Sequence, residues 1–179
     1  MISDHSKKEV KTIIEDVGLN TAMIEPGMVE IPEKVPKEKY DILNNALRKN
    51  DFEIITGKEN IILEKIKCTV IEMVHYSDEL PEVNNSLYIS EKLRANYTYL
   101  SKFFSKVKNI TLEQFIILHK IERVKRLLVY NEMTLSEIAW KMHYSSTAHL
   151  SAQFKKVTGI TPTFFKKSKY KKLTPVENL

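Results

Sequence analysis

The side chains that stand out as able to do chemistry are basic, and they gather in one part of the chain. Splitting the 179 residues after Leu80 gives 11 basic and 16 acidic residues in the first part, a net charge of −5, and 17 basic and 7 acidic residues in the second, a net charge of +10. Charge divided this sharply predicts two modules with different partners, the second attracted to a polyanion such as a phosphate backbone. Charge alone leaves open a merely solubilising lysine surface, so the residue pattern has to decide.

The residue types that enzymes and metal sites need are not arranged as such sites require. The sequence has no Gly-rich phosphate loop, no carboxylate pair with a histidine and no nucleophile motif, so an enzyme is the least expected class. His143 and His149 do not share a helical face and have no cysteine companions, and Cys68 is expected to be a small apolar core residue. We therefore expect no catalytic residue, no metal and no cofactor.

A short unit of two helices joined by a turn is written twice in the second part. The second helix of each unit has the same pattern, because residues 100–107 align with residues 150–157. Each follows a short amphipathic helix, at 87–93 and 135–142, which gives the outline of a helix-turn-helix. A helix that begins after Thr111, with Gln114 completing its cap, and ends near Tyr130 joins the two units. Its length of roughly 27 Å is close to the roughly 34 Å between successive major-groove faces, so two recognition helices are expected to enter neighbouring grooves.

These motifs resemble the DNA-binding domain of the AraC/XylS family of bacterial transcription regulators. The matching stretches are 89–93 and 99–104 in the first unit, 121–128 in the connecting helix, and 135–139, 144–146, 149–150, 154–162 and 165–166 in the second unit. The closing pattern Phe-Lys-Lys-x-x-Gly-x-Thr-Pro is highly characteristic of that family. The resemblance implies an all-α domain of two helix-turn-helix units joined by a long helix, a sequence-specific transcription regulator, and double-stranded DNA as its partner.

The resemblance also implies which side chains contact DNA and which do not. Bases are expected to be read from the N-terminal part of each recognition helix, by Tyr97, Thr98, Ser101, Lys102, Thr147, Ala148, His149, Ser151, Ala152 and Gln153. Phosphates are expected to be bound by Asn96, Lys120, Arg123, Ser146, Lys155, Lys166 and Lys167. Packing inside the domain is predicted for Tyr99, Phe103, Phe104, Ile138, Trp140, Leu150 and Phe154. Family members usually have glycine in each turn, where this sequence has Arg94 and His143, and either residue can adopt a positive φ at a cost of about 1 kcal/mol.

The first module reads as helix, two strands, helix, strand. Apolar residues at helical spacing predict a helix that ends at Gly18, Pro26-Gly27 predicts a hairpin turn, Pro36 opens a second helix, and residues 51–55 alternate as a short strand. This αββαβ order resembles a ferredoxin-like unit of the heavy-metal-associated type without its first strand. Such carriers hold metals with a Cys-x-x-Cys pair, which this sequence lacks.

The expected organisation is therefore an α+β module at 1–80 that ends in a linker helix over 61–74, a DNA-binding domain at 81–172, and a flexible tail at 173–179. The linker helix has apolar side chains on two flanks, which favours a homodimer through residues 1–80, with burial inside a monomer as the alternative. RNA polymerase is a further expected partner.

Other readings remain open for the whole chain. One alternative is that the first module is a ligand or metal sensor that controls DNA binding. Another is that the second is a protein-interaction module that has lost DNA affinity. The longest uninterrupted aliphatic or aromatic run, 115–118, is far below the roughly 18 residues of a membrane span, and no signal segment or cysteine pair is present. A cytoplasmic protein without a membrane partner is expected.

Overall fold

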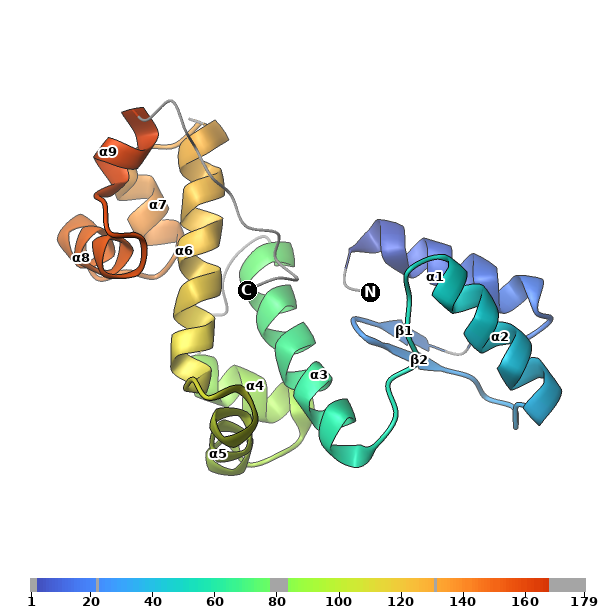
Figure 1. Cartoon of the computed structure of the whole chain (residues 1–179). Helices are drawn as coiled ribbons and strands as arrows, with labels where there is room; N and C mark the ends of the chain where they lie inside the picture. The colour runs from blue at the N-terminus through green and yellow to red at the C-terminus, as the bar shows by residue number, and fades with distance from the viewer. Residues whose placement is uncertain (1–2, 22, 78–83, 131, 168–179) are drawn as a thin grey trace. The chain divides into compact units, whose positions relative to one another are not determined.

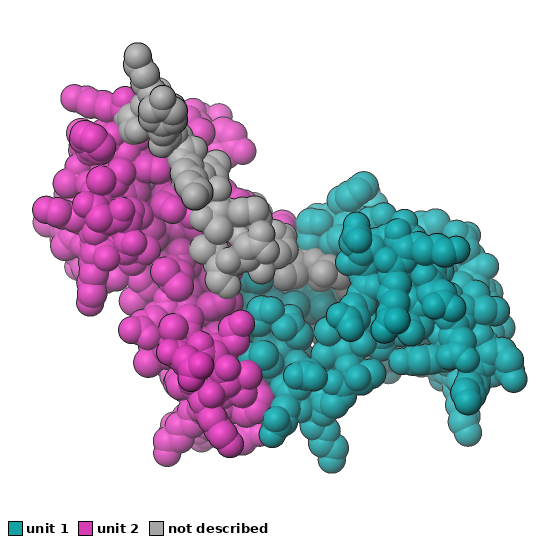
Figure 2. Space-filling view, viewed as in Figure 1, with its two compact units in different colours: residues 1–72 teal, residues 73–179 magenta. Residues whose placement is uncertain are grey.

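The computed structural model describes residues 3–21, 23–77, 84–130 and 132–167, and the chain divides into two compact units, residues 1–72 and 73–179 (Figures 1 and 2). The predicted boundary at Leu80 and the predicted tail at 173–179 lie outside the described residues.

The first unit packs two helices and a hairpin around a small core. Ser3 begins the first helix by accepting a hydrogen bond from the Ser6 backbone N–H, and the strands pair antiparallel with Ile24 opposite Val29. The elements are α1 (Asp4–Asp16), β1 (Met23–Glu25), β2 (Met28–Glu30), α2 (Lys37–Lys49) and α3 (Lys58–Ile71). The core consists of Val10, Ile13, Ile14, Leu19, Leu43 and Leu47. This core explains the helical spacing of apolar residues that the sequence shows in α1 and α2.

The predicted strand at 51–55 is wrong. Asp51 has a φ of 60°, and the Phe52 backbone N–H donates to the Leu47 carbonyl at 3.0 Å, so the segment closes the end of α2 instead of joining the sheet. Phe52 and Ile54 pack against the helical core. The alternating apolar residues therefore pack against the helices, and the segment pairs with no strand among the described residues. The described residues form αββα followed by α3, and the ferredoxin-like arrangement is not shown.

The hairpin turn lies against α3. Gly27 has a φ of 72°, and a Cβ added to it would come within 2.5 Å of the Cys68 Sγ. Cys68 is buried, and burial raises the pKa of its thiol, so its predicted role as a small core residue is confirmed. Along α3, Ile66 and Val70 are fully buried whereas Ile61 is 39% exposed. A homodimer through this module stays a prediction.

The second unit is helical. It begins with η1 (Glu72–Tyr76), a single π-helical turn, and continues with α4 (Asn85–Leu93), α5 (Tyr97–Lys108), α6 (Leu112–Tyr130), α7 (Leu135–Lys141), α8 (Thr147–Thr158) and α9 (Pro162–Lys167). Figure 1 shows α4 and α5 at one end of α6 and α7, α8 and α9 at the other. The Phe104 ring packs on Phe115 at 5.0 Å between centroids, and Phe154 packs on Phe165 at 5.6 Å. Each recognition helix is thus fixed to the helix that follows it.

Replacing Gly27 by alanine should lower the free energy of unfolding of the first unit through two effects. The positive φ costs about 1 kcal/mol and the contact with Cys68 about 1 to 3 kcal/mol more. Gly57→Ala is the matched control, because Gly57 also has a positive φ but its added Cβ would meet only the Asn60 side chain at 3.8 Å. Urea unfolding followed by circular dichroism measures both. Equal losses in the two variants, or no recovery in Gly27→Ala/Cys68→Ala, would show that the close approach is unimportant.

Candidate nucleic-acid interface

The two recognition helices begin and end in the same way, 50 residues apart. The Asn96 side chain accepts from the Tyr99 N–H at 3.3 Å at the start of α5, and Ser146 accepts from the His149 N–H at 3.0 Å at the start of α8. Both helices end at a residue in the left-handed region, which is Asn109 in the first unit. The equal spacing of the caps means that the two recognition helices have the same length of 12 residues.

The predicted positive φ in both turns is confirmed. Arg94 has a φ of 49° and His143 a φ of 53°. The next residue closes the turn in each unit, since the Ala95 N–H donates to Ser90 and the Tyr144 N–H donates to Ala139. From this point to the helix cap the second turn is one residue longer, and the extra residue is Ser145. The left-handed residue and the backbone bond that closes the turn are common to both units.

The predicted base-reading residues lie on the accessible side of both helices. The buried side is formed by Leu100 and Phe104 in α5 and by Leu150 and Phe154 in α8. Among the predicted readers, Thr98, Lys102, Ala148, His149 and Ala152 are exposed, and Tyr97, Ser101, Thr147, Ser151 and Gln153 are half-buried. None of these side chains belongs to the buried stripe of its helix, and their contact with DNA stays a prediction.

Two aromatic residues predicted to pack inside the domain do not. Trp140 is 75% exposed because α7 is short and buries one stripe, Ile138 and Ala139, next to Met142. Tyr99 is 54% exposed and stacks on Phe103, with 6.3 Å between ring centroids. Helical spacing alone could not identify the exposed side of either helix.

Two basic residues predicted to bind phosphate have partners inside the unit. The Lys120 ammonium donates to the Met142 carbonyl at 3.3 Å and lies 5.9 Å from the centroid of the Tyr144 ring, and burial lowers its pKa. The Arg123 guanidinium donates to the carbonyls of Val74 and Ser77. These contacts hold the second turn and η1 against α6, and phosphate binding by the two side chains stays a prediction.

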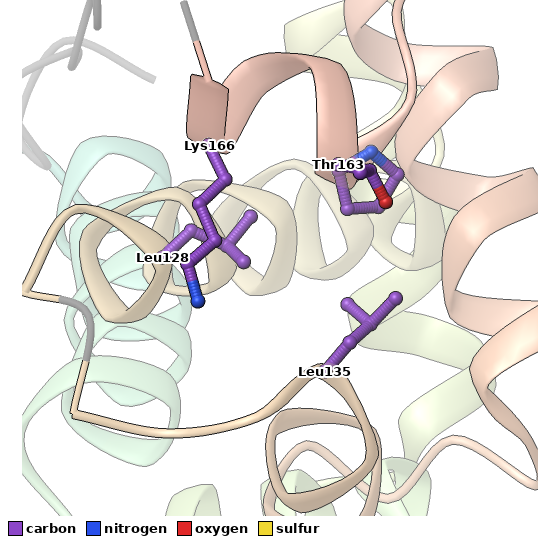
Figure 3. A pocket seen from close by; sticks show the side chains of 5 residues that line it. Leu128, Leu135, Thr163 and Lys166 are labelled. Atoms are coloured by element: carbon purple, nitrogen blue, oxygen red, sulfur yellow. The ribbon is translucent and has the colours of Figure 1, made fainter.

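The other predicted phosphate contacts are nearer the surface. Lys155 and Lys167 are exposed. Lys166 is half-buried and lines a small pocket with Leu128, Leu135, Pro162 and Thr163 (Figure 3). The pocket volume of about 70 Å³ is well below the roughly 300 to 1,000 Å³ of typical small-molecule sites, so it gives no support to a ligand there.

A histidine pair that sequence reasoning missed joins η1 to α6. His75 Nε2 and His119 Nδ1 are 3.1 Å apart, and the His119 ring is fully buried against Phe115. Burial, then the neighbouring His119 and the guanidinium groups of Arg126 and Arg123, lower the pKa of His75 to about 3. The two histidines are 44 residues apart in sequence, so no spacing rule could have paired them.

The described ranges contain neither a cluster of metal-ligating side chains nor a helix suited to span a membrane. In those ranges no group of three or more His, Cys, Asp or Glu side chains could hold a metal ion. Across the same part of the chain, no helix has the length and apolar character needed to cross a bilayer.

Comparison with known proteins agrees with this geometry. Residues 89–168 match a family model described as a helix-turn-helix domain. The chain is 25% identical over 134 residues to YtdP, an uncharacterized HTH-type transcriptional regulator of Bacillus subtilis, which covers 73% of this chain and 17% of that protein. It is 29% identical over 79 residues to the Msm operon regulatory protein of Streptococcus mutans, and this match covers 44% of this chain and 28% of that protein. Its fold is similar to the C-terminal domain of AraT, a response regulator from Geobacillus stearothermophilus, with a TM-score of 0.52 and 21% identity over 64% of this chain and 93% of that one.

These matches confirm one expectation and leave another unconfirmed. The second unit contains a helix-turn-helix domain, and the two curated relatives are described as regulators. The likeness of the first module to heavy-metal-associated domains is not confirmed. The chain spans less than a third of the length of the two curated relatives.

The His75 contact should make the second unit sensitive to acid. The folded-state pKa is depressed, so below about pH 6.5 the unfolded chain binds a proton that folded His75 does not bind until about pH 3. As the pH is lowered from about 6.5 to about 3, the free energy of unfolding should therefore decrease, by at most about 1.4 kcal/mol per pH unit from this group. His75→Gln, whose amide can still bond to His119, should flatten the pH dependence measured by urea unfolding. His5→Gln, at an exposed position in α1, is the control, and identical slopes for all three proteins would refute the assignment.

The Tyr144 hydroxyl should be dispensable for stability. Its oxygen is buried without a hydrogen-bond partner among the described residues, and burial raises the pKa of Tyr144 to about 12. Tyr144→Phe should leave the thermal midpoint unchanged or raise the free energy of unfolding by up to about 1 kcal/mol. Tyr144→Ala, which removes the ring, should lower it by about 3 kcal/mol. A large loss in Tyr144→Phe would mean that the hydroxyl is bonded in solution.

Proposed function

We propose that this chain is a sequence-specific DNA-binding transcription regulator that places α5 and α8 in two successive major grooves of one duplex. The observation that carries the proposal is the presence of two capped helices, α5 and α8, each second in a helix-turn-helix and each packed against the connecting helix α6 (Figure 1). A helix-turn-helix reads base edges from the N-terminal part of its second helix.

The length of α6 supports two simultaneous contacts. Its 19 residues give a rise of about 28 Å. Successive major-groove faces on one side of a duplex are roughly 34 Å apart. Since α5 and α8 both pack against α6, this helix determines their separation, which we expect to be close to one turn of DNA.

The charge of the second unit supports a phosphate partner. Lys102 and Lys106 are exposed on α5, and Lys155 and Lys156 are exposed on α8. The first turns of both helices also carry backbone N–H groups of the kind that bind phosphate oxygens. Basic side chains beside polar helix faces give affinity and register together.

The chemistry of the faces suggests how bases are read. Lys102 can donate to guanine O6 or N7, and Gln153 can form two hydrogen bonds with adenine. Ala148 and Ala152 can pack on thymine methyl groups. Small side chains on α8 favour modest specificity from one site, which two sites bound by a homodimer would increase.

Three further parts of the proposal go with this function. Double-stranded DNA is the partner, and a homodimer would form through residues 1–80. RNA polymerase as a further partner and a cytoplasmic location would follow from a role in transcription regulation. The first module as a ligand or metal sensor gains no support from any specific feature of the described residues.

Two substitutions on α8 should separate affinity from specificity. Lys155→Ala should weaken binding to all duplexes and lower the slope of log affinity against log salt by about 1. Gln153→Ala should instead cost about 1 to 3 kcal/mol of discrimination at a single base pair with little change in the salt slope. Selection from a random duplex pool followed by titration at several salt concentrations measures both.

The control is Lys8→Ala, which removes an exposed lysine from α1 and should change neither quantity. Wild-type protein that enriches no motif and shows no salt-dependent duplex binding would contradict the proposed function and favour a protein-interaction module.

A further inference from the structure

We propose that Ser145 is a positioning residue that sets the base preference of His149, by donating its hydroxyl proton to Nδ1 and leaving Nε2–H to donate to guanine. The inference rests on the proposed function, because it concerns how α8 reads DNA. It names a turn residue outside the set of side chains that the sequence pointed to.

Three consecutive residues of the second turn hold His149. Ser145 Oγ lies 3.1 Å from His149 Nδ1, which fixes the ring through one nitrogen. The Tyr144 ring meets the His149 ring edge to face, with centroids 5.2 Å apart and planes at 84°. Ser146 accepts from the His149 backbone N–H at 3.0 Å. The backbone, the ring plane and one ring nitrogen are therefore all fixed by the turn.

The support behind His149 is itself anchored. The Tyr144 backbone N–H donates to Ala139 at 2.9 Å, and its ring packs under the Lys120 ammonium of α6. Lys120 also donates to the Met142 carbonyl. Because the connecting helix holds the turn and the turn holds the ring, His149 is oriented by the fold before any DNA arrives.

The first helix-turn-helix, formed by α4 and α5, lacks this arrangement in the described residues. The position equivalent to His149 is Tyr99, and the residue equivalent to Tyr144 is Ala95, which has no ring. Ser145 is the extra residue of the longer second turn, so nothing corresponds to it between Ala95 and Asn96. In the described part of the chain, the Tyr99 ring stacks on Phe103, along its own helix. The extra residue Ser145 thus gives His149 a hydrogen-bond partner that Tyr99 does not have.

The chemistry follows from the two nitrogens of a neutral imidazole, of which one accepts and the other donates. When Nδ1 accepts from the Ser145 hydroxyl, the proton must be on Nε2, and the His149 side chain that carries it is exposed. In the major groove a donor suits guanine best, because guanine offers two acceptors, O6 and N7. Adenine and thymine each offer one acceptor, N7 and O4, and cytosine offers only an amino donor. A ring fixed in this tautomer favours guanine.

The tautomer can be tested directly on the full chain without DNA. Two-bond ¹⁵N–¹H correlation spectra at about pH 8, where imidazoles are neutral, should show His149 with Nδ1 unprotonated and Nε2 protonated. Ser145→Ala should give averaged shifts of both tautomers, with an unchanged thermal midpoint. Ser136→Ala, at an exposed serine on α7, should leave the His149 spectrum as in wild type. A proton on Nδ1 in wild type, or no change in Ser145→Ala, overturns the inference.

Selection from a random duplex pool gives the second readout. Wild type should prefer guanine at one position, and Ser145→Ala should reduce that preference by about tenfold with the other positions and the salt slope unchanged. A preference for adenine or cytosine there, or an equal loss at every position, overturns the role of Ser145 while duplex binding itself stands. Absence of salt-dependent duplex binding by wild type overturns the proposed function as well.

Discussion

Burial of α6 against both helix-turn-helix units is the interaction on which the rest of the second unit depends. Phe115 packs on Phe104 near its start, and Val124 and Leu128 are buried further along. The sequence of α6 contains neither glycine nor proline, so nothing in it favours a kink. A straight helix with apolar residues buried along its length converts two small units, each too small to bury a core alone, into one body with a fixed spacing.

The same helix also holds polar side chains that bond to other elements. Lys120 and His119 are on α6, yet their partners are in the second turn and in η1. Glu122 is 1% exposed and pairs with Lys125 at 2.9 Å, which keeps a buried charge compensated. Because these contacts are made by side chains of one rigid element, a change at either end of α6 acts on how the helix-turn-helix units are held.

The two helix-turn-helix units share backbone features but differ in the side chains that surround the recognition helix. The caps and the left-handed turn residues recur in both units, but the second turn has one more residue. That residue, Ser145, bonds to His149, whereas Tyr99 stacks along its own helix. The compact unit of residues 1–72 has a core of its own, formed by α1, α2 and the hairpin. In that unit Gly27 fits against Cys68 only because it has no side chain.

The sequence by itself determined the features that local physics controls. Helix periodicity, the reciprocal cap of Thr111 and Gln114, the positive φ at Arg94 and His143, and the double helix-turn-helix were all predicted and are present. These depend on residues within one turn of each other, so their spacing is sufficient. The segment 51–55 showed the limit, because alternation cannot say whether a neighbouring strand exists to pair with it. Only the tertiary structure decided that Trp140 is exposed, that Lys120 and Arg123 bond inside the unit, and that His75 meets His119. Each of these depends on which elements pack together, and contacts between residues far apart in sequence leave no periodic signal in the chain.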